Sequence, residues 1–250
     1  MIGAIDALGF AKPFVMDSGT KRSLHFAIGE TQSRMDVLHP NRLEVSYTRI
    51  MMGFLLFVPA PASIGMIGLG GGSLAKFCYS TLHSACIEVS EVNPHVIALR
   101  EQFAIPDDDH RFKIIRTDGA EFVRASPGRF DGLLVDGYDG AGLPARLGSQ
   151  SFYDHCASAL SANGVMVANL NLDTPRDAQQ ITRMRRSFGG QALVVEDAGG
   201  NKIAFGTNGA VFRDVRRSAL FRSAKRTAYD DGPLTRAFTS IDRALASANG

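Results

Sequence analysis

The stretch 64-IGMIGLGGGSLAKFCYST-81 decides the fold of this chain. A short apolar run, Ile64–Gly68, enters a glycine cluster, and apolar side chains then recur at helical spacing from Ser73 to Thr81. Strand, glycine turn and helix in this order are typical of the first unit of an open parallel sheet, where missing side chains let the backbone approach a ligand. Alone, the glycine loop is a weak signal, because a tight turn has the same composition.

The same alternation of strand and helix continues along the chain. Further strands are predicted at Ala85–Val89, Phe112–Arg116, Phe130–Asp136 and Gly164–Leu170, with a final hairpin formed by Ala192–Asp197 and Lys202–Thr207. Helices are predicted at Ser46–Phe57, Pro94–Phe103, Gly119–Arg124, Ser151–Leu160 and Arg176–Phe188. Strands that alternate with helices at this spacing indicate a parallel sheet with helices on both faces.

Five parallel-type strands closed by an antiparallel pair predict an α/β fold with a Rossmann-like, class I methyltransferase-like, seven-stranded sheet. Short extended runs before it predict a small N-terminal β appendage, and a helical tail is expected at the C-terminus. We therefore divide the chain into a β-hairpin segment at 1–45, a nucleoside-binding domain at 46–209 and a basic tail at 210–250.

Composition and charge exclude several classes of function. The chain has 250 residues with 27 Lys and Arg against 25 Asp and Glu, so it lacks the basic field of a protein that coats nucleic acid. Its longest apolar stretch, Ile50–Pro59, is about half the length that crosses a bilayer. We expect a soluble, cytoplasmic protein with no nucleic-acid or membrane partner. Three cysteines without CxxC spacing and six histidines without HxH or HxxxH spacing predict reduced core thiols and no metal site.

Acidic residues follow the next two predicted strands. Glu91 comes 23 residues after Gly68, close to the roughly 20-residue spacing at which an acid binds ribose hydroxyls. Asp118 follows the third strand, where it could accept from an adenine amino group while Gly119 leaves room for the ring. An Asp-Gly pair is also a common turn. The glycine loop and both acids, each after its own strand, together predict an adenosine-containing ligand.

The loop after the fourth predicted strand, residues 136–144 (DGYDGAGLP), carries two acids three positions apart. Carboxylates that share a cleft repel each other, so we expect Asp136 and Asp139 to face a cation. The alternative is that Asp136 caps a helix and Asp139 belongs to a turn.

At this point the sequence resembles the polyamine aminopropyltransferases, best known as spermidine synthases. The resemblance covers about residues 30–170. It is carried in order by Ile67–Gly72 at the place of the family's glycine-rich loop, Ser90–Pro94, Asp118, Gly119, Phe122, 130–144 and Ser151–Tyr153. Upstream, Gln32 and Tyr47 are similar to the Gln and Tyr that line the nucleoside and amine sites in the family.

The resemblance implies transfer of an aminopropyl group from decarboxylated S-adenosylmethionine, a co-substrate and not a tightly bound cofactor, to a polyamine such as putrescine. An ammonium has no lone pair, so the enzyme must remove a proton while it holds the amine in line with the donor. Asp136 is the candidate base, and the amine and donor are expected to contact Asp139, Tyr138, Gln32 and Tyr47. The candidates for binding the nucleoside are Gly68, Gly70, Gly72, Glu91, Asp118 and Gly119.

Three positions depart from the family's pattern. Gly71 stands where the family has an Asp that helps hold the donor's free amino group, Asn93 replaces the second acid of a Glu-Ile-Asp run, and Arg49 stands where an acid is usual. An arginine at 49 could repel a polyamine or, if turned inward, bind a carboxylate. Two alternatives stay open, a methyltransferase that uses intact S-adenosylmethionine and a non-catalytic nucleoside-binding protein.

The C-terminal tail is basic, and its cations are interpreted either as a solvated helix face or as a docking patch for an acidic partner. These cations are Arg213, Arg216, Arg217, Arg222, Lys225 and Arg226. A homodimer is expected from the family resemblance and from an exposed apolar face on the predicted 46–57 helix.

Overall fold

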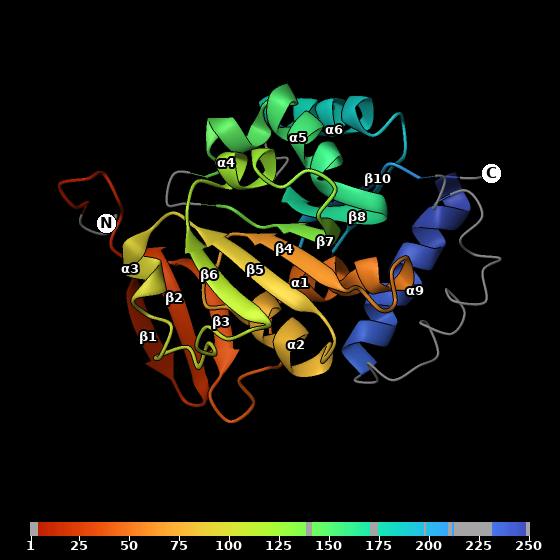
Figure 1. Ribbon diagram of the computed structural model, residues 1–250. Coiled ribbons are helices and arrows are strands. Elements are labelled where there is room, and N and C mark those ends of the chain that lie inside the picture. Colours follow the sequence, from red (N-terminus) through yellow and green to blue (C-terminus); the bar gives the residue numbers. More distant parts are fainter. Residues whose placement is uncertain are drawn as a thin grey trace.

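A computed structural model describes residues 5–138, 142–170, 175–197, 199–209, 212 and 232–248. Its centre is a seven-stranded sheet in the order β6-β5-β4-β7-β8-β10-β9 (Figure 1). The strands are β4 (Ser63–Ile67), β5 (Cys86–Glu91), β6 (Phe112–Arg116), β7 (Phe130–Val135), β8 (Leu160–Leu170), β9 (Ala192–Glu196) and β10 (Lys202–Thr207). Strands β4 to β8 pair in parallel, and β10 runs antiparallel to both β8 and β9. The predicted α/β sheet is confirmed.

Helices cover both faces of the sheet, because side chains along each strand alternate between two hydrophobic clusters. On β8, Val165 and Val167 belong to one cluster, whereas Met166 and Ala168 belong to the other. The face of Met166 carries α4 (Gly119–Arg124), α5 (Gln150–Ala159) and α6 (Pro175–Ser187). The opposite face carries α1 (Ser46–Met51), the 3-10 helix η1 (Met52–Leu56), α2 (Ser73–Thr81) and α9 (Gly232–Ala248). Figure 1 shows these two layers above and below the sheet.

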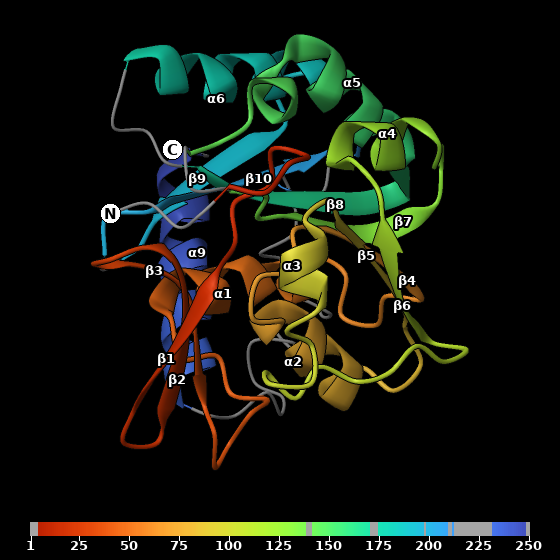
Figure 2. The same ribbon diagram turned by 90° about the vertical axis from the view of Figure 1, so that its left-hand side faces the viewer.

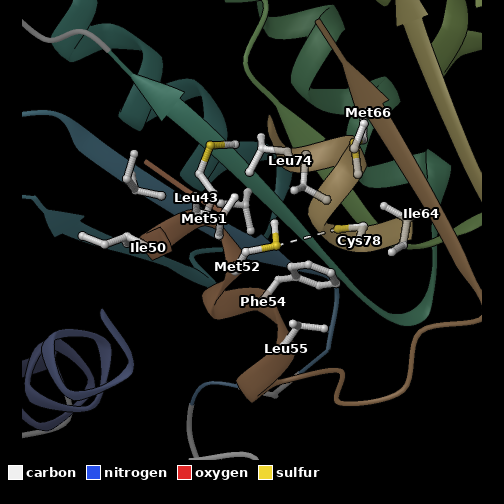
Figure 3. Packing of buried hydrophobic residues seen from close by; sticks show 14 of the residues in the cluster. Leu43, Ile50, Met51, Met52, Phe54, Leu55, Ile64, Met66, Leu74 and Cys78 are labelled. Carbon is white, nitrogen blue, oxygen red and sulfur yellow. Dashed lines mark hydrogen bonds between the residues drawn. The ribbon is translucent and has the colours of Figure 1, made fainter. Parts of the chain in front are cut away.

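The apolar residues predicted as one helix over Ser46–Phe57 are divided between α1 and η1, and they are buried. Figure 3 shows this packing, in which Met52 contacts the thiol of Cys78 on α2. On another side η1 meets α9, since a Cβ on Gly53 would lie 2.0 Å from Cδ1 of Ile241. The expectation of an exposed apolar face on this helix is therefore wrong, because α9 covers it. The homodimer stays a prediction.

The helix predicted over Pro94–Phe103 is shorter in the structure. α3 spans Pro94–Ile97, and the chain continues to Phe103 in turns. Ala104 has a φ of +51°, in the left-handed region that a helix does not tolerate. This turn lets the side chains of Phe103 and Ile105 both enter the core beside the glycine loop. Tight turns thus produce a spacing that resembles an amphipathic helix.

The three cysteines are free thiols. Cys78 and Cys156 are buried, and burial raises the pKa of each thiol, so both remain protonated at neutral pH. Cys86, which begins β5, is exposed. The expectation of core thiols is wrong for this one residue, because Cys86 stands where the strand emerges from the core.

A smaller antiparallel sheet of three strands precedes the main one, as the β appendage was expected to do. Its strands are β1 (Phe14–Ser18), β2 (Lys21–Ala27) and β3 (Glu30–Asp36). The basic residues predicted as a patch, from 213 to 226, lie outside the described residues. The division into 1–45, 46–209 and 210–250 stays a proposal. In the part of the chain that the structure describes, no helix combines the length and apolar character needed to cross a membrane.

Gly53→Ala tests how α9 docks on η1. The added methyl must displace Cδ1 of the fully buried Ile241, so we expect the free energy of unfolding to fall by about 1 to 3 kcal/mol. Ile241→Val removes that Cδ1, so the double variant should lose less than the sum of the two single losses. Urea denaturation followed by circular dichroism measures all three variants. Strictly additive losses would contradict the contact.

Candidate active site

A cavity of about 1000 Å³ opens at the carboxyl ends of the parallel strands, where open α/β sheets bind their ligands. Glu91, Asp118 and Asp136 bring three carboxylates to its wall. Its described lining residues include no Lys, Arg or His. Arg146 lies 3.7 Å from Asp118, whereas Glu91 and Asp136 have no cationic partner among the described ion pairs. Carboxylates lower the potential inside a cleft, so this cavity is suited to a ligand that carries positive charge.

The glycine loop forms one wall of the cavity. Gly68 has a φ of +93°, and a Cβ on it would lie 2.2 Å from the carbonyl oxygen of Asp136. Gly70, with a φ of +50°, borders the cavity, and a Cβ there would make only an ordinary contact with Cβ of Ser33 at 3.8 Å. A Cβ on Gly72 would instead meet Ile105 at 2.5 Å. The structure therefore places Gly68 and Gly70 at the cavity, whereas core packing explains Gly72.

Glu91 lies at the end of β5 and lines the cavity. Its carboxylate accepts hydrogen bonds from the backbone amides of Leu69 at 3.0 Å and Asn93 at 2.8 Å. Burial raises the pKa of Glu91, and these amides oppose the rise. The carboxylate is thus fixed beside the glycine loop, while Glu88, the other acid of β5, pairs with Arg129.

Asp118 lines the cavity and also caps α4. Its Oδ1 accepts hydrogen bonds from the amides of Ala120 at 2.9 Å and Glu121 at 3.2 Å, and its Oδ2 lies 3.7 Å from the guanidinium of Arg146. Gly119 also lines the cavity, and a Cβ there would lie 2.4 Å from Cγ2 of Ile67, so packing against Ile67 already requires the missing side chain. That Gly119 leaves room for an adenine ring stays a prediction.

Asp136 joins side chains from distant parts of the chain. Its Oδ2 accepts a hydrogen bond from the hydroxyl of Tyr47 on α1 at 2.8 Å, and its Oδ1 accepts one from the amide of Asn169 on β8 at 3.0 Å. Burial raises the pKa of Asp136, while the hydrogen bonds from Asn169 and Tyr47 lower it. Burial and the neighbouring carboxylate raise the pKa of Tyr47 as well, so the phenol stays protonated and donates. Asp136 is held by side chains and does not act as a helix cap.

Reasoning from the sequence missed Asn169. This residue is 8% exposed and lines the cavity, and its Oδ1 has no hydrogen-bond partner among the described residues. A buried acceptor without a partner costs free energy, and a ligand N–H would remove that cost. Asn169 stands near the carboxyl end of a parallel strand, as Glu91 does, so the rule that found Glu91 would also have found it.

The other predicted amine-site residues come from separate segments. Gln32 lines the cavity from β3. Tyr138 lines it from the loop after β7 and donates a hydrogen bond to the backbone carbonyl oxygen of Asn169 at 3.1 Å. Asp139 lies outside the described residues. The structure therefore brings Gln32 and Tyr138 to the same cavity as Asp136 and its two hydrogen-bond donors, Tyr47 and Asn169.

Comparison with known proteins identifies the family. The model of the spermine/spermidine synthase domain matches residues 46–188. A polyamine aminopropyltransferase of Neisseria meningitidis is 38% identical over 187 residues, which is 74% of this chain and 71% of the relative. The chain belongs to the spermine/spermidine synthase family. The resemblance found in the sequence is confirmed, and the match includes Glu91, Asp118, Asp136 and Asn169.

Solved structures agree on the fold. A probable spermidine synthase from Corynebacterium glutamicum has a TM-score of 0.69 at 19% identity, and the match covers 82% of each chain. A spermidine synthase in complex with the transition-state analogue AdoDATO has a TM-score of 0.64 at 22% identity, over 94% of this chain and 89% of that one. The fold of this chain is therefore that of the spermidine synthases.

Gly71 departs from the pattern of the spermine/spermidine synthase family, and the packing around it leaves no room for a side chain. A Cβ at this position would lie 2.7 Å from Oγ of Ser33 and 2.9 Å from the ring of Phe103. The backbone of Phe103 is in turn held by Lys76, whose buried ammonium donates to its carbonyl oxygen at 2.6 Å. An aspartate at 71 would therefore require several residues to move.

Arg49, another departure from the family's pattern, makes no approach to the cavity. Its guanidinium donates hydrogen bonds to the carbonyl oxygens of Leu43 at 2.7 Å and Glu44 at 3.0 Å, and it is not among the lining residues. Asn93 caps α3 by accepting from the amide of His95 at 3.0 Å. Arg49 thus neither repels an amine in the cavity nor binds a carboxylate there.

Asn169→Ala should raise the pKa of Asp136, because it removes a hydrogen bond that stabilises the ionised carboxylate. A hydrogen bond to a charged group contributes about 1.5 to 3 kcal/mol, so its loss should produce a measurable rise. Titration of the aspartate carboxyl carbons by 13C NMR measures this shift. Asn201→Ala is the matched control, because Asn201 also lines the cavity but bonds to Asp197. Equal shifts in the two variants would contradict the assignment.

Proposed function

We propose that this chain transfers an aminopropyl group from decarboxylated S-adenosylmethionine to a primary amine such as putrescine. Membership of the spermine/spermidine synthase family supports a transfer of this kind. At the level of residues, one observation carries the proposal. The buried carboxylate of Asp136 stands in a cavity whose described walls carry acids and no cationic side chain.

The chemistry requires one proton acceptor. The sulfonium of the donor is already activated, so the amine nitrogen bonds to the aminopropyl carbon as the bond from that carbon to sulfur breaks, and methylthioadenosine leaves. The nitrogen attacks only after its ammonium form has lost a proton. Asp136 accepts that proton, and Tyr47 and Asn169 hold its carboxylate in place. Burial supports this role, because the raised pKa makes Asp136 a stronger base than an exposed carboxylate.

The charge of the cavity favours the decarboxylated donor over intact S-adenosylmethionine. The intact donor carries a carboxylate, which would need a cationic partner on leaving water, and the described lining residues offer none. Gly71 supplies no acid to repel that carboxylate, so selectivity rests on Glu91, Asp118 and Asp136 and on the missing cation.

The remaining residues receive roles by their position. We assign Glu91 to the ribose hydroxyls, Oδ2 of Asp118, which does not cap α4, to the adenine amino group, and Gly68 and Gly70 to the close approach of the donor. The proposed amine contacts are Gln32, Tyr47, Tyr138 and Asp139. A cytoplasmic location, a homodimer, and the lack of a metal, nucleic-acid or membrane partner remain predictions from the sequence.

Asp136→Asn should abolish transfer while the affinity for methylthioadenosine stays within a few-fold. The amide keeps the size of the carboxylate but accepts no proton, and loss of a general base lowers the rate by about 100 to 10,000-fold. Production of methylthioadenosine from decarboxylated donor and putrescine measures the rate, and calorimetry measures the affinity.

Glu88→Gln is the matched control, since Glu88 belongs to the same sheet but pairs with Arg129. Its rate should equal that of the wild type. If Asp136→Asn loses nucleoside binding, the residue is structural. If the variant keeps its rate, Asp136 is not the base.

Calorimetry with the two donors separates this proposal from its alternatives. Decarboxylated S-adenosylmethionine should bind at least about tenfold more tightly than the intact donor, because a buried carboxylate without a partner is costly. Tighter binding of the intact donor would favour a methyltransferase. A wild-type protein that binds the nucleoside but turns over none of a panel of primary amines would favour a non-catalytic nucleoside-binding protein.

A further inference from the structure

Residues 5–11, here called the N-terminal strap, form a closed loop with its own hydrogen bonds. Ile5 and Ala11, at the two ends of the strap, pair as an antiparallel bridge. Inside it, Oδ1 of Asp6 accepts hydrogen bonds from the amides of Leu8 at 2.8 Å and Phe10 at 2.9 Å. The backbone amide of Asp6 donates in return to the carbonyl of Phe10 at 2.9 Å. Contacts within the strap therefore define its shape in addition to those it makes with the rest of the protein.

Three side chains hold the strap on the main domain. Asp6 lies 2.8 Å from Nε2 of His95 on α3, and Asn93 donates a hydrogen bond to the carbonyl of Ala11 at 2.8 Å. The guanidinium of Arg116, at the end of β6, lies over the ring of Phe10 at 6.0 Å from its centroid. The strap lies beside α3 in both views (Figure 1 and Figure 2). It thus bridges the ends of β5 and β6.

This position is where the adenosine part of the donor is assigned. The attachment at Asn93 is two residues beyond Glu91, and the attachment at Arg116 is two residues before Asp118. Between these attachments, Phe10 lines the cavity together with Ile5, Gly9 and Ala11. Leu8 points elsewhere, since it is 74% exposed and is not among the lining residues.

We propose that the N-terminal strap is a wall of the nucleoside site and that Phe10 is the residue of the strap that contacts the base. This assignment rests on the proposed binding of an adenosine-containing donor in the same cavity. Asp6, His95 and Asn93 act as positioning residues, because they hold the strap in place without contacting the adenine ring themselves. An aromatic ring at this place adds apolar contact to a site otherwise defined by Glu91 and Asp118.

Phe10→Ala should weaken methylthioadenosine binding about tenfold or more, the loss expected when an aromatic partner of a base is removed. Calorimetry on the full chain measures the dissociation constant. Leu8→Ala is the matched control on the same strap and should bind as the wild type does. In steady-state kinetics, Phe10→Ala should raise KM for the donor and leave kcat and KM for the amine unchanged, a split that a general folding defect would not produce.

His95→Ala separately tests how the N-terminal strap is attached to α3. It removes the partner of Asp6 without touching Phe10, so methylthioadenosine should bind more weakly, by less than the loss in Phe10→Ala. Amide hydrogen exchange of a peptide that contains residues 5–11 should slow in the wild type when methylthioadenosine is added. Unchanged exchange, or an unchanged dissociation constant in Phe10→Ala, would overturn the assignment of the strap.

The outcomes separate the strap from the transfer reaction. If Phe10→Ala binds like the wild type while the wild type transfers aminopropyl groups, only the strap proposal fails. If the wild type transfers nothing but Phe10→Ala loses nucleoside affinity, the strap proposal stands and the proposed reaction fails. A wild-type protein that binds no adenine nucleoside overturns both.

Discussion

The close contact between the ends of the two central strands is the constraint on which the site depends. Gly68 follows β4, and its Cα lies so near the backbone of Asp136 that a Cβ would stand 2.2 Å from the carbonyl oxygen. The amide of Asp136 donates to the carbonyl of Ile67, and the amide of Gly68 donates to the carbonyl of Ser90, both at 2.9 Å. These bonds bring the glycine loop, the end of β5 and the loop after β7 together. The cavity exists because β4 ends between two neighbours, without a side chain in the way.

The buried carboxylate of Asp136 sets a second condition. Its ionised form loses hydration in the cavity, and the hydrogen bonds of Tyr47 and Asn169 replace part of what water supplied. Tyr47 can do this only because α1 is fixed, and α1 continues into η1, which α9 covers on the side of Gly53. A helix near the C-terminus thereby supports a hydroxyl of the active site. The support is indirect, through packing, and none of the described side chains of α9 lines the cavity.

Departures from the family's pattern are explained by packing and by charge. Ser33 and Phe103 occupy the space where a side chain at position 71 would begin. The missing acid at Gly71 therefore goes together with the packing of its neighbours. The guanidinium of Arg49 donates its hydrogen bonds to the backbone carbonyls of Leu43 and Glu44. The result is a cavity that keeps its negative character through Glu91, Asp118 and Asp136, each at the end of a parallel strand. A positively charged donor and amine suit this arrangement without the usual acid of the loop.

The sequence by itself determined the alternation of strands and helices, because the periods of apolar residues are local, and it placed Gly68, Glu91 and Asp136 at strand ends where parallel strands converge. Only the tertiary structure decided which residues meet. Asn169 reaches Asp136 across 33 residues and Asn93 reaches Ala11 across 82, distances at which no local pattern predicts a contact. The same holds for Gly72 and Gly119, whose missing side chains make room for Ile105 and Ile67. A sequence shows that a glycine is present, but the neighbour that requires it is set by how the layers pack.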